Sequence, residues 1–385
     1  MNKLINILLA VSMVVLGACR EEFWPDLTKY ENLLVVDGLI TNDSGPYEVK
    51  LSFSTAVQNP DFNPFSGAQV VIMDNEGTSE TLTETSPGIY TTAANGIQGV
   101  IGQQYKLIVT TPGENHYESD FQTLMDPVGI SEVHAEVETI QTENDYYPLY
   151  GYQFYIDTEL AKSDTNFLMW RMYGDYKYTS DFLIKYIYDK RKLKVFPKPD
   201  SLYTCFAKDK ITNLITMSTE ELTVPKIDRL PLNFVNTETQ KLSIRYSLLV
   251  KQLTMTKDAF TFYSVLSDLN SQEGALYTQQ PYQVNGNIYN VNDAGDALLG
   301  YFLVAGVSEK RIFVDRPTGV DFHYGICVLT RRDFEAYGYI RFNDPASWPL
   351  YVTTDPDGAR ALPHQDCVDC RRKGGSINKP DFWED

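Results

Sequence analysis

Alternation of apolar and polar residues in short segments constrains the fold of this chain more than any other feature of its sequence. The clearest case is residues 47–53, YEVKLSF, in which every second residue is apolar. A period of two predicts a β-strand with one buried side and one side facing water. Similar segments, separated by turn residues, continue to residue 126. About seven such strands predict an immunoglobulin-like or fibronectin-like β-sandwich over residues 31–126.

The chain beyond Asp126 and Pro127 is predicted to be a second, larger β-rich domain over residues 127–385. One helix is expected within it, near residues 256–272. Thr256 can cap that helix, and apolar residues then follow at the spacing of one helical face, namely Ala259, Phe262, Tyr263 and Leu266. Further alternating segments cover residues 150–156, 182–188 and 242–250. The predicted fold class is therefore mainly β, with one inserted helix.

The N-terminus has the order of a secretory signal. Lys3 precedes an apolar run over residues 4–16, which is too short to cross a bilayer, and Gly17 and Ala18 follow. Cys19 comes directly afterwards, an arrangement that resembles the lipobox of bacterial lipoproteins. The resemblance implies that residues 1–18 are removed and that Cys19 carries acyl chains that hold the protein in the outer membrane. The alternative is an ordinary cleaved signal.

Residues 19–30 are predicted to be a lipidated tether. Glu21 and Glu22 lie just after the cysteine and resemble the export signal of surface-exposed lipoproteins of Bacteroidota. This implies that the protein faces the cell exterior. The alternative is a solvated tether on a protein that faces the periplasm.

The charge of the chain excludes one class of partner. It has 51 acidic and 33 basic side chains, a net charge of −18. Binding to nucleic acid requires clustered Lys and Arg that neutralise phosphates, so we expect no nucleic-acid partner. The sequence also has no Gly-rich nucleotide loop, no nucleophile elbow and no metalloprotease motif, so we predict no catalytic residues and no cofactor.

Lipidation of Cys19 leaves four cysteines, Cys205, Cys327, Cys367 and Cys370. An even number in an exported protein predicts disulfides, with three possible connectivities. We favour a local Cys367–Cys370 bridge and a long Cys205–Cys327 bridge. Two alternatives are a redox-active Cys367–Cys370 pair and a zinc site that includes His364.

Two further sets of residues are candidates for binding. The first set is a group of possible calcium ligands in one loop: Asn290, Asn292, Asp293 and Asp296. Their side-chain oxygens have spacings that suit calcium, but the same residue types also form ordinary turns. The second set is aromatic: Tyr146, Tyr147, Tyr150, Trp348 and Tyr351. Exposed aromatic side chains can stack on sugars or anchor an interface, but at alternate strand positions they also fill cores.

Several passages together resemble a family of Bacteroidota outer-membrane lipoproteins known as domain of unknown function 4249 (DUF4249). They are LVVDGLI and GPYEVKLS at residues 34–52, YESD at 117–120, the segment 286–302, and the tail from Cys367 to Trp383. The resemblance extends over nearly the whole mature chain. It implies an outer-membrane lipoprotein often encoded beside a TonB-dependent transporter, and it supplies no catalytic residues.

These observations predict a non-enzymatic lipoprotein that acts as an accessory or binding subunit of a TonB-dependent barrel protein, by capturing a nutrient or capping the barrel. One alternative is a structural or assembly subunit of an outer-membrane complex that binds no small molecule. Another is an extracellular hydrolase, because acidic pairs cannot be assigned from spacing alone.

Overall fold

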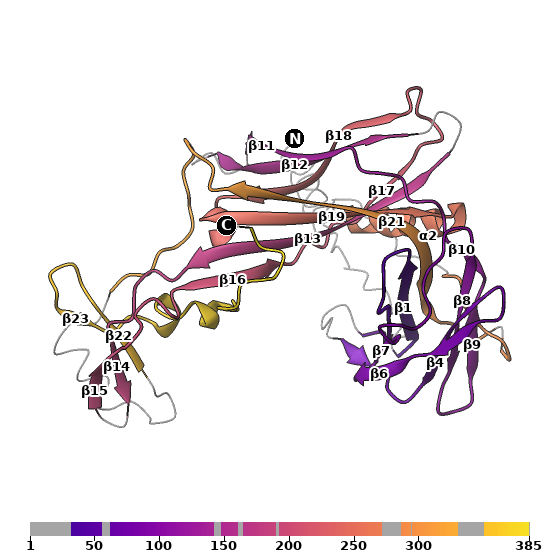
Figure 1. The fold of residues 1–385 in the computed structure, drawn as a ribbon, viewed down its shortest axis with the longest axis horizontal. Helices are drawn as coiled ribbons and strands as arrows, with labels where there is room; N and C mark the ends of the chain where they lie inside the picture. Colours follow the sequence, from indigo (N-terminus) through magenta and orange to yellow (C-terminus); the bar gives the residue numbers. More distant parts are fainter. Residues whose placement is uncertain are drawn as a thin grey trace, which may run out of the picture.

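The computed structural model describes residues 32–55, 62–141, 148–160, 165–189, 192–271, 286–293, 295–329 and 350–384. This part of the chain is mainly β and contains several sheets and one α-helix, which confirms the predicted fold class. An N-terminal β-sandwich, a long central sheet and a small β lobe follow one another along the longest axis of the molecule (Figure 1).

The N-terminal sandwich consists of two sheets whose inner faces form a common core. In the segment 47–53, Val49 and Leu51 are fully buried and Glu48 is exposed, as the alternation predicts. The first sheet contains β1 (Leu34–Thr41), β2 (Glu48–Phe53), β3 (Asn63–Pro64), β6 (Thr83–Ser86) and β7 (Ile89–Thr91). The second contains β4 (Gln69–Asp74), β5 (Ser79–Thr81), β8 (Gln104–Thr110), β9 (His116–Ser119) and β10 (Gln122–Thr123).

Strands from far along the chain complete this sandwich. The first part of β21 (Leu299–Asp315) pairs in parallel with β1, from Val35 opposite Leu299 to Thr41 opposite Ala305. β20 (Ile288–Asn290) extends the second sheet by pairing with β9. The described residues of 31–126 therefore share both sheets with strands that were predicted to belong to the next domain. The domain boundary itself stays a prediction.

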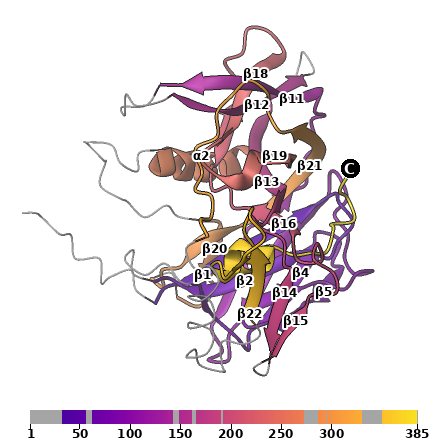
Figure 2. The same cartoon turned by 90° about the vertical axis from the view of Figure 1, so that its left-hand side faces the viewer.

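The second part of β21 enters the central sheet, whose strand order is β16–β13–β19–β21. A three-stranded sheet covers one face of it (Figure 2), and Phe154, Trp170 and Tyr246 lie fully buried between the two. The central strands are β13 (Phe167–Thr179), β16 (Thr204–Asp209) and β19 (Arg245–Met255), with β17 (Ile215–Ser218) on β13. The covering strands are β11 (Glu132–Ile140), β12 (Leu149–Glu159) and β18 (Lys226–Asn236).

The opposite face of the central sheet is covered at its two ends. The predicted helix, α2 (Lys257–Ser271), covers one end, and the Thr256 hydroxyl accepts a hydrogen bond from the Ala259 N–H at 3.4 Å, as expected of a cap. At the other end, the ring of Trp383 lies 5.0 Å from that of Phe206 and 5.5 Å from that of Phe313. The middle of this face lies between these two coverings.

The small lobe is a four-stranded sheet with its own apolar core. It contains β14 (Tyr186–Asp189), β15 (Lys192–Val195), β22 (Leu350–Thr354) and β23 (Arg360–Ala361). Short 3-10 helices at Gln240–Leu242, Gln365–Cys367 and Cys370–Lys373 complete the described elements. No helix in the described ranges is long and apolar enough to cross a membrane.

Candidate functional site

The candidate site is a pocket of about 450 Å³ where the N-terminal sandwich meets the uncovered middle of the central sheet. β1, β2 and the loop between them form one wall, and β13 and β19 form the other. The alternation that buries Val36 and Val49 turns Asp37 and Lys50 outward, into this wall. The charged lining residues are Asp37, Asp43, Glu48, Lys50, Arg171 and Lys251.

Hydrogen bonds hold the loop between β1 and β2 in place. The hydroxyl of buried Tyr47 lies 2.6 Å from the carbonyl oxygen of Asp43 and accepts a hydrogen bond from the Gly99 N–H at 3.0 Å. Burial raises the pKa of Tyr47, which keeps this hydroxyl protonated. The Asn42 side chain accepts from the Val307 N–H at 2.6 Å and donates to the Val307 carbonyl at 3.3 Å. The loop is thus tied both to the sandwich and to β21.

Lys251 links the two walls by ion pairs. Its Nζ lies 3.0 Å from Asp43 Oδ2 in the loop and 3.0 Å from Glu309 Oε2 on β21. Burial disfavours the charged ammonium, but the hydrogen bonds to the two carboxylates outweigh burial and raise the pKa of Lys251. Lys251 therefore stays charged in the pocket.

Arg171 and Tyr173 give the β13 wall its binding groups. Arg171 stands opposite Lys251 in the register of β13 and β19. Its guanidinium acts on the hydroxyl of Tyr263 on α2. Burial raises the pKa of that hydroxyl to about 12, and the positive charge of Arg171 acts in the opposite direction. Within the described ranges, no carboxylate forms an ion pair with Arg171. The Tyr173 side chain is 46% exposed and available for stacking.

The lining of the pocket suits a polar molecule. Its size lies within the range typical of small-ligand sites. Both signs of charge are present. Asp37 on one wall can attract a cationic group, and Arg171 on the other can bind an anionic one in a forked geometry, whereas Glu48 is paired with Lys50 at 3.0 Å. Tyr173 adds an aromatic face.

Two of the aromatic residues suggested by the sequence are described by the structure, and neither of them lines this pocket. Tyr351 is buried in the core of the small lobe, where its ring lies 5.6 Å from that of Phe196. Tyr150 lies half-buried on β12, opposite Thr139. Tyr146, Tyr147 and Trp348 lie outside the described residues, as does the lipidation candidate Cys19.

The calcium candidates form a hydrogen-bonded turn. Asn290 Oδ1 accepts from the N–H groups of Asn292 and Asp293 at 2.9 and 3.2 Å, and Asp293 Oδ1 accepts from the Gly295 N–H at 2.8 Å. The Asn290 amide donates to Asp296 at 2.8 Å. Turn formation accounts for these residue types, and calcium binding stays an untested prediction.

The favoured disulfide pairing is wrong, although all four cysteines are paired. Cys370 bonds to Cys205 and Cys367 bonds to Cys327, with S–S distances of 2.02 and 1.98 Å. Cys367 ends one 3-10 helix and Cys370 begins the next, so the two side chains reach different neighbours. Because these four thiols are all oxidised, this arrangement also contradicts the redox pair and the zinc site at these cysteines.

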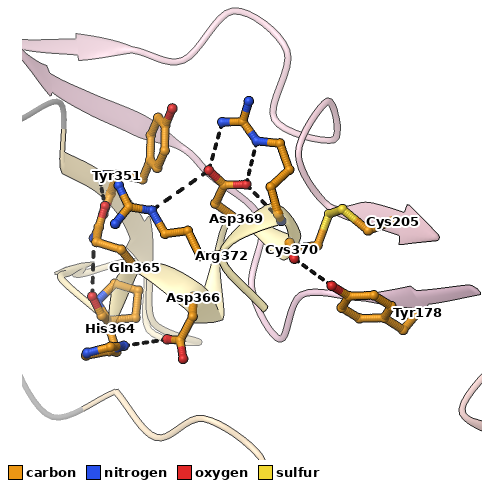
Figure 3. Close-up of polar contacts among 11 residues, drawn as sticks. Tyr178, Cys205, Tyr351, His364, Gln365, Asp366, Asp369, Cys370 and Arg372 are labelled. Carbon is orange, nitrogen blue, oxygen red and sulfur yellow. Dashed lines mark hydrogen bonds and ion pairs between the residues drawn. A yellow bond between two sulfur atoms is a disulfide. The ribbon is translucent and has the colours of Figure 1, made fainter. Parts of the chain in front are cut away.

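Polar contacts around Cys370 fix the tail against the central sheet (Figure 3). Tyr178 on β13 donates a hydrogen bond to the Cys370 carbonyl at 2.6 Å. The carboxylate of buried Asp369 accepts two hydrogen bonds from Arg371, at 2.9 and 2.8 Å. His364 lies nearby with a side chain that is 85% exposed and contacts Asp366. The arrangement is that of a structural anchor.

Sequence reasoning missed Arg171 and Lys251. A signal was present, because each is a cation inside a largely apolar run, FLMWRM and SLLVKQL. A charge within such a run is costly unless it is paired or faces water. That both cations face the same pocket depends on the pairing of β13 with β19.

Comparison with known proteins adds one relationship. A family model with the description "Domain of unknown function (DUF4249)" matches residues 20–311, most of the chain. The match agrees with the resemblance found in the sequence. No curated protein matches this chain.

Proposed function

Because this chain belongs to the family of the domain of unknown function DUF4249, whose description names no activity, we propose a function from the chain's own residues. It is a non-enzymatic, lipid-anchored binding protein of the outer membrane that faces the cell exterior. It captures a small zwitterionic molecule, the class that includes amino acids and short peptides, and passes it to a TonB-dependent barrel protein.

The observation that carries the binding role is the charge arrangement of the pocket. Arg171, which forms an ion pair with no described carboxylate, suits a ligand carboxylate. Asp37 on the opposite wall suits a ligand ammonium group, while the neighbouring Glu48 is paired with Lys50 at 3.0 Å. Lys251 is already engaged by Asp43 and Glu309, so it supports the walls rather than the ligand.

The location rests on the N-terminus and the cysteines. The order of residues 1–19 supports lipidation at Cys19. The two disulfides support an oxidising compartment outside the cytoplasm. Both observations are expected of a protein held on the outer membrane by acyl chains.

A ligand screen tests the binding role. The full chain, purified in mild detergent, is melted with a panel of amino acids, dipeptides and neutral sugars. We expect a zwitterionic member to raise the melting temperature, because ligand that binds only the folded state stabilises it. Arg171→Gln should abolish the shift, whereas Arg360→Gln on the small lobe should retain it. A shift produced only by neutral sugars, or one unchanged in Arg171→Gln, would contradict the proposed ligand class.

A pull-down tests the partner. The tagged full chain is recovered from native outer membranes in mild detergent, and co-purifying proteins are identified by mass spectrometry. A stoichiometric TonB-dependent barrel supports the transporter role. Recovery with assembly proteins and no transporter would favour the structural-subunit alternative, and recovery of the protein alone would contradict the transporter role.

A further inference from the structure

The outer face of the three-stranded sheet carries a cluster of metal-ligating side chains far from the pocket. This sheet lies at the top of the molecule in Figures 1 and 2. Because Val133 and Phe154 point into the core, the even-numbered residues of β11 and the odd-numbered residues of β12 point outward. The register sets Glu132 opposite Asp157 and His134 opposite Tyr155.

Three of these side chains converge. One ligand atom from each of Glu132, His134 and Asp157 lies within 4.8 Å of the other two. His134 Nδ1 and Asp157 Oδ2 are 3.5 Å apart. Tetrahedral zinc, with bonds of about 2.0–2.1 Å, separates two of its ligand atoms by about 3.3 Å. The observed separation is close to that value and needs little movement to admit an ion.

The His134 ring is already oriented for such a role. Its Nδ1 is buried and has no hydrogen-bond partner within the described part of the chain. Its Nε2 faces Glu136 Oε1 at 3.8 Å, and its ring stacks on that of Tyr155 at 5.5 Å. Histidine ligands of metals commonly present their second nitrogen to a carboxylate in this way.

The Asp157 carboxylate is likewise held in place through one of its two oxygens. Its Oδ1 accepts a hydrogen bond from the Arg229 N–H at 2.6 Å, which leaves Oδ2 directed toward His134. Arg229 has a positive φ of 50°, an uncommon conformation for a residue other than glycine. Its guanidinium binds Glu136 and lies 4.5 Å from the Tyr155 ring centre, so its charge is engaged beside the cluster.

We propose that Glu132, His134 and Asp157 form a surface site for a divalent transition-metal ion, with zinc as the best fit. An imidazole nitrogen with two carboxylates suits zinc better than calcium or magnesium, which prefer oxygen ligands alone. Glu132 is exposed, so the fourth coordination position is open to water or to a ligand from outside the chain. Glu136 and Arg229 act as positioning residues.

Zinc titration of the full chain in mild detergent tests the site, by calorimetry and by melting temperature with and without Zn²⁺. We expect one zinc ion bound through this cluster and a zinc-dependent rise in melting temperature. His134→Ala and Asp157→Asn should each weaken this binding by at least about tenfold. Asp157→Asn keeps an oxygen for the Arg229 N–H, so its zinc-free melting temperature should match that of the wild type.

His116→Ala is the matched control. His116 also contacts a carboxylate, with its Nε2 3.1 Å from Glu118 Oε1, but Lys106 binds the same carboxylate at 2.6 Å. This variant should bind zinc as the wild type does. Zinc binding that is absent in the wild type, unchanged in His134→Ala and Asp157→Asn, or lost equally in His116→Ala would overturn the proposal.

Discussion

At the scale of single residues, Gln252 shows how a polar side chain can be accommodated in the central core. Its amide oxygen accepts hydrogen bonds from the Trp170 indole and the Thr158 hydroxyl, both at 2.9 Å. Its amide nitrogen donates to the Val128 carbonyl at 2.7 Å. Gln252 is fully buried, so these three bonds have no water to replace them. One side chain thereby joins β13, β12 and the segment that follows Pro127.

Replacing Gln252 with leucine should destabilise the protein. The change would leave the Trp170 and Thr158 donors and the Val128 acceptor without hydrogen-bond partners. Each unsatisfied group lowers the free energy of unfolding by about 1–3 kcal/mol. We expect the free energy of unfolding to fall by about 3 kcal/mol, measured by urea denaturation. Gln69→Leu, at an exposed position of β4, serves as the control and should change little. Equal effects of the two variants would contradict the role of the network.

The pH dependence of stability should report on Glu118. The hydrogen bond from Lys106, opposed in part by burial, lowers the pKa of Glu118 below its usual value of 4.5. A lowered pKa means that the folded state favours the ionised form, so the stabilisation is present above pH 4.5 and is lost as the pH falls through the folded-state pKa. Glu118→Gln should therefore lower the melting temperature at neutral pH, and the difference should shrink in acid. A difference that is constant with pH would refute this.

At the scale of elements, β21 connects the two main parts of the molecule. Its first residues pair in parallel with β1, and its later residues, from Gly306 to Asp315, pair antiparallel with β19. Gly300 permits the close approach to β1. Its φ is +102°, and a Cβ there would lie 1.8 Å from the carbonyl oxygen of Val36. The parallel pairing thus requires glycine at this position.

Gly300→Ala should disrupt this pairing. The substitution adds both backbone strain and a clash with the β1 backbone, and we expect a loss of at least about 2 kcal/mol in the free energy of unfolding. Hydrogen exchange should become faster in β1 and at the start of β21. Gly129→Ala, where a Cβ would meet nothing within 4 Å, is the control. Unchanged exchange in β1 would show that the strand pairing tolerates a side chain.

At the scale of the whole molecule, the two disulfides tie the tail to distant parts of the chain. Cys205–Cys370 spans 165 residues and Cys327–Cys367 spans 40. In the chain-entropy model, loops of these lengths correspond to upper limits of about 5 and 4 kcal/mol. The longer bridge also holds the segment that leads to Trp383, which covers the end of the central sheet.

Removing the Cys205–Cys370 bridge should release this tail. In the double variant Cys205→Ala/Cys370→Ala, we expect faster tryptic cleavage at Arg371 and Arg372 and a lower melting temperature. The variant Cys327→Ala/Cys367→Ala should lower the melting temperature by less, because its loop is shorter. Limited proteolysis with mass spectrometry measures the first effect. Protection of the tail equal to that of the wild type would mean that packing alone holds it.

Local structure was largely predictable from the sequence. The alternation at residues 47–53 predicted both the strand β2 and its buried face, and the cap and apolar stripe predicted α2. These features depend on residues that are close together in the chain. Within such a segment, the period of the apolar residues indicates which side of the helix or strand is buried. The presence of disulfides followed equally from the number of cysteines and the predicted secretory signal.

The pairing of distant segments was decided by the tertiary structure alone. Nothing local indicates that β21 lies beside β1, or that Cys370 meets Cys205 rather than Cys367. The pocket and the proposed metal site depend on such pairings, since Arg171 meets Lys251, and His134 meets Asp157, only across strands. Alternation sets the face of each strand, but strand order depends on how all the faces pack together, which no short stretch of sequence contains.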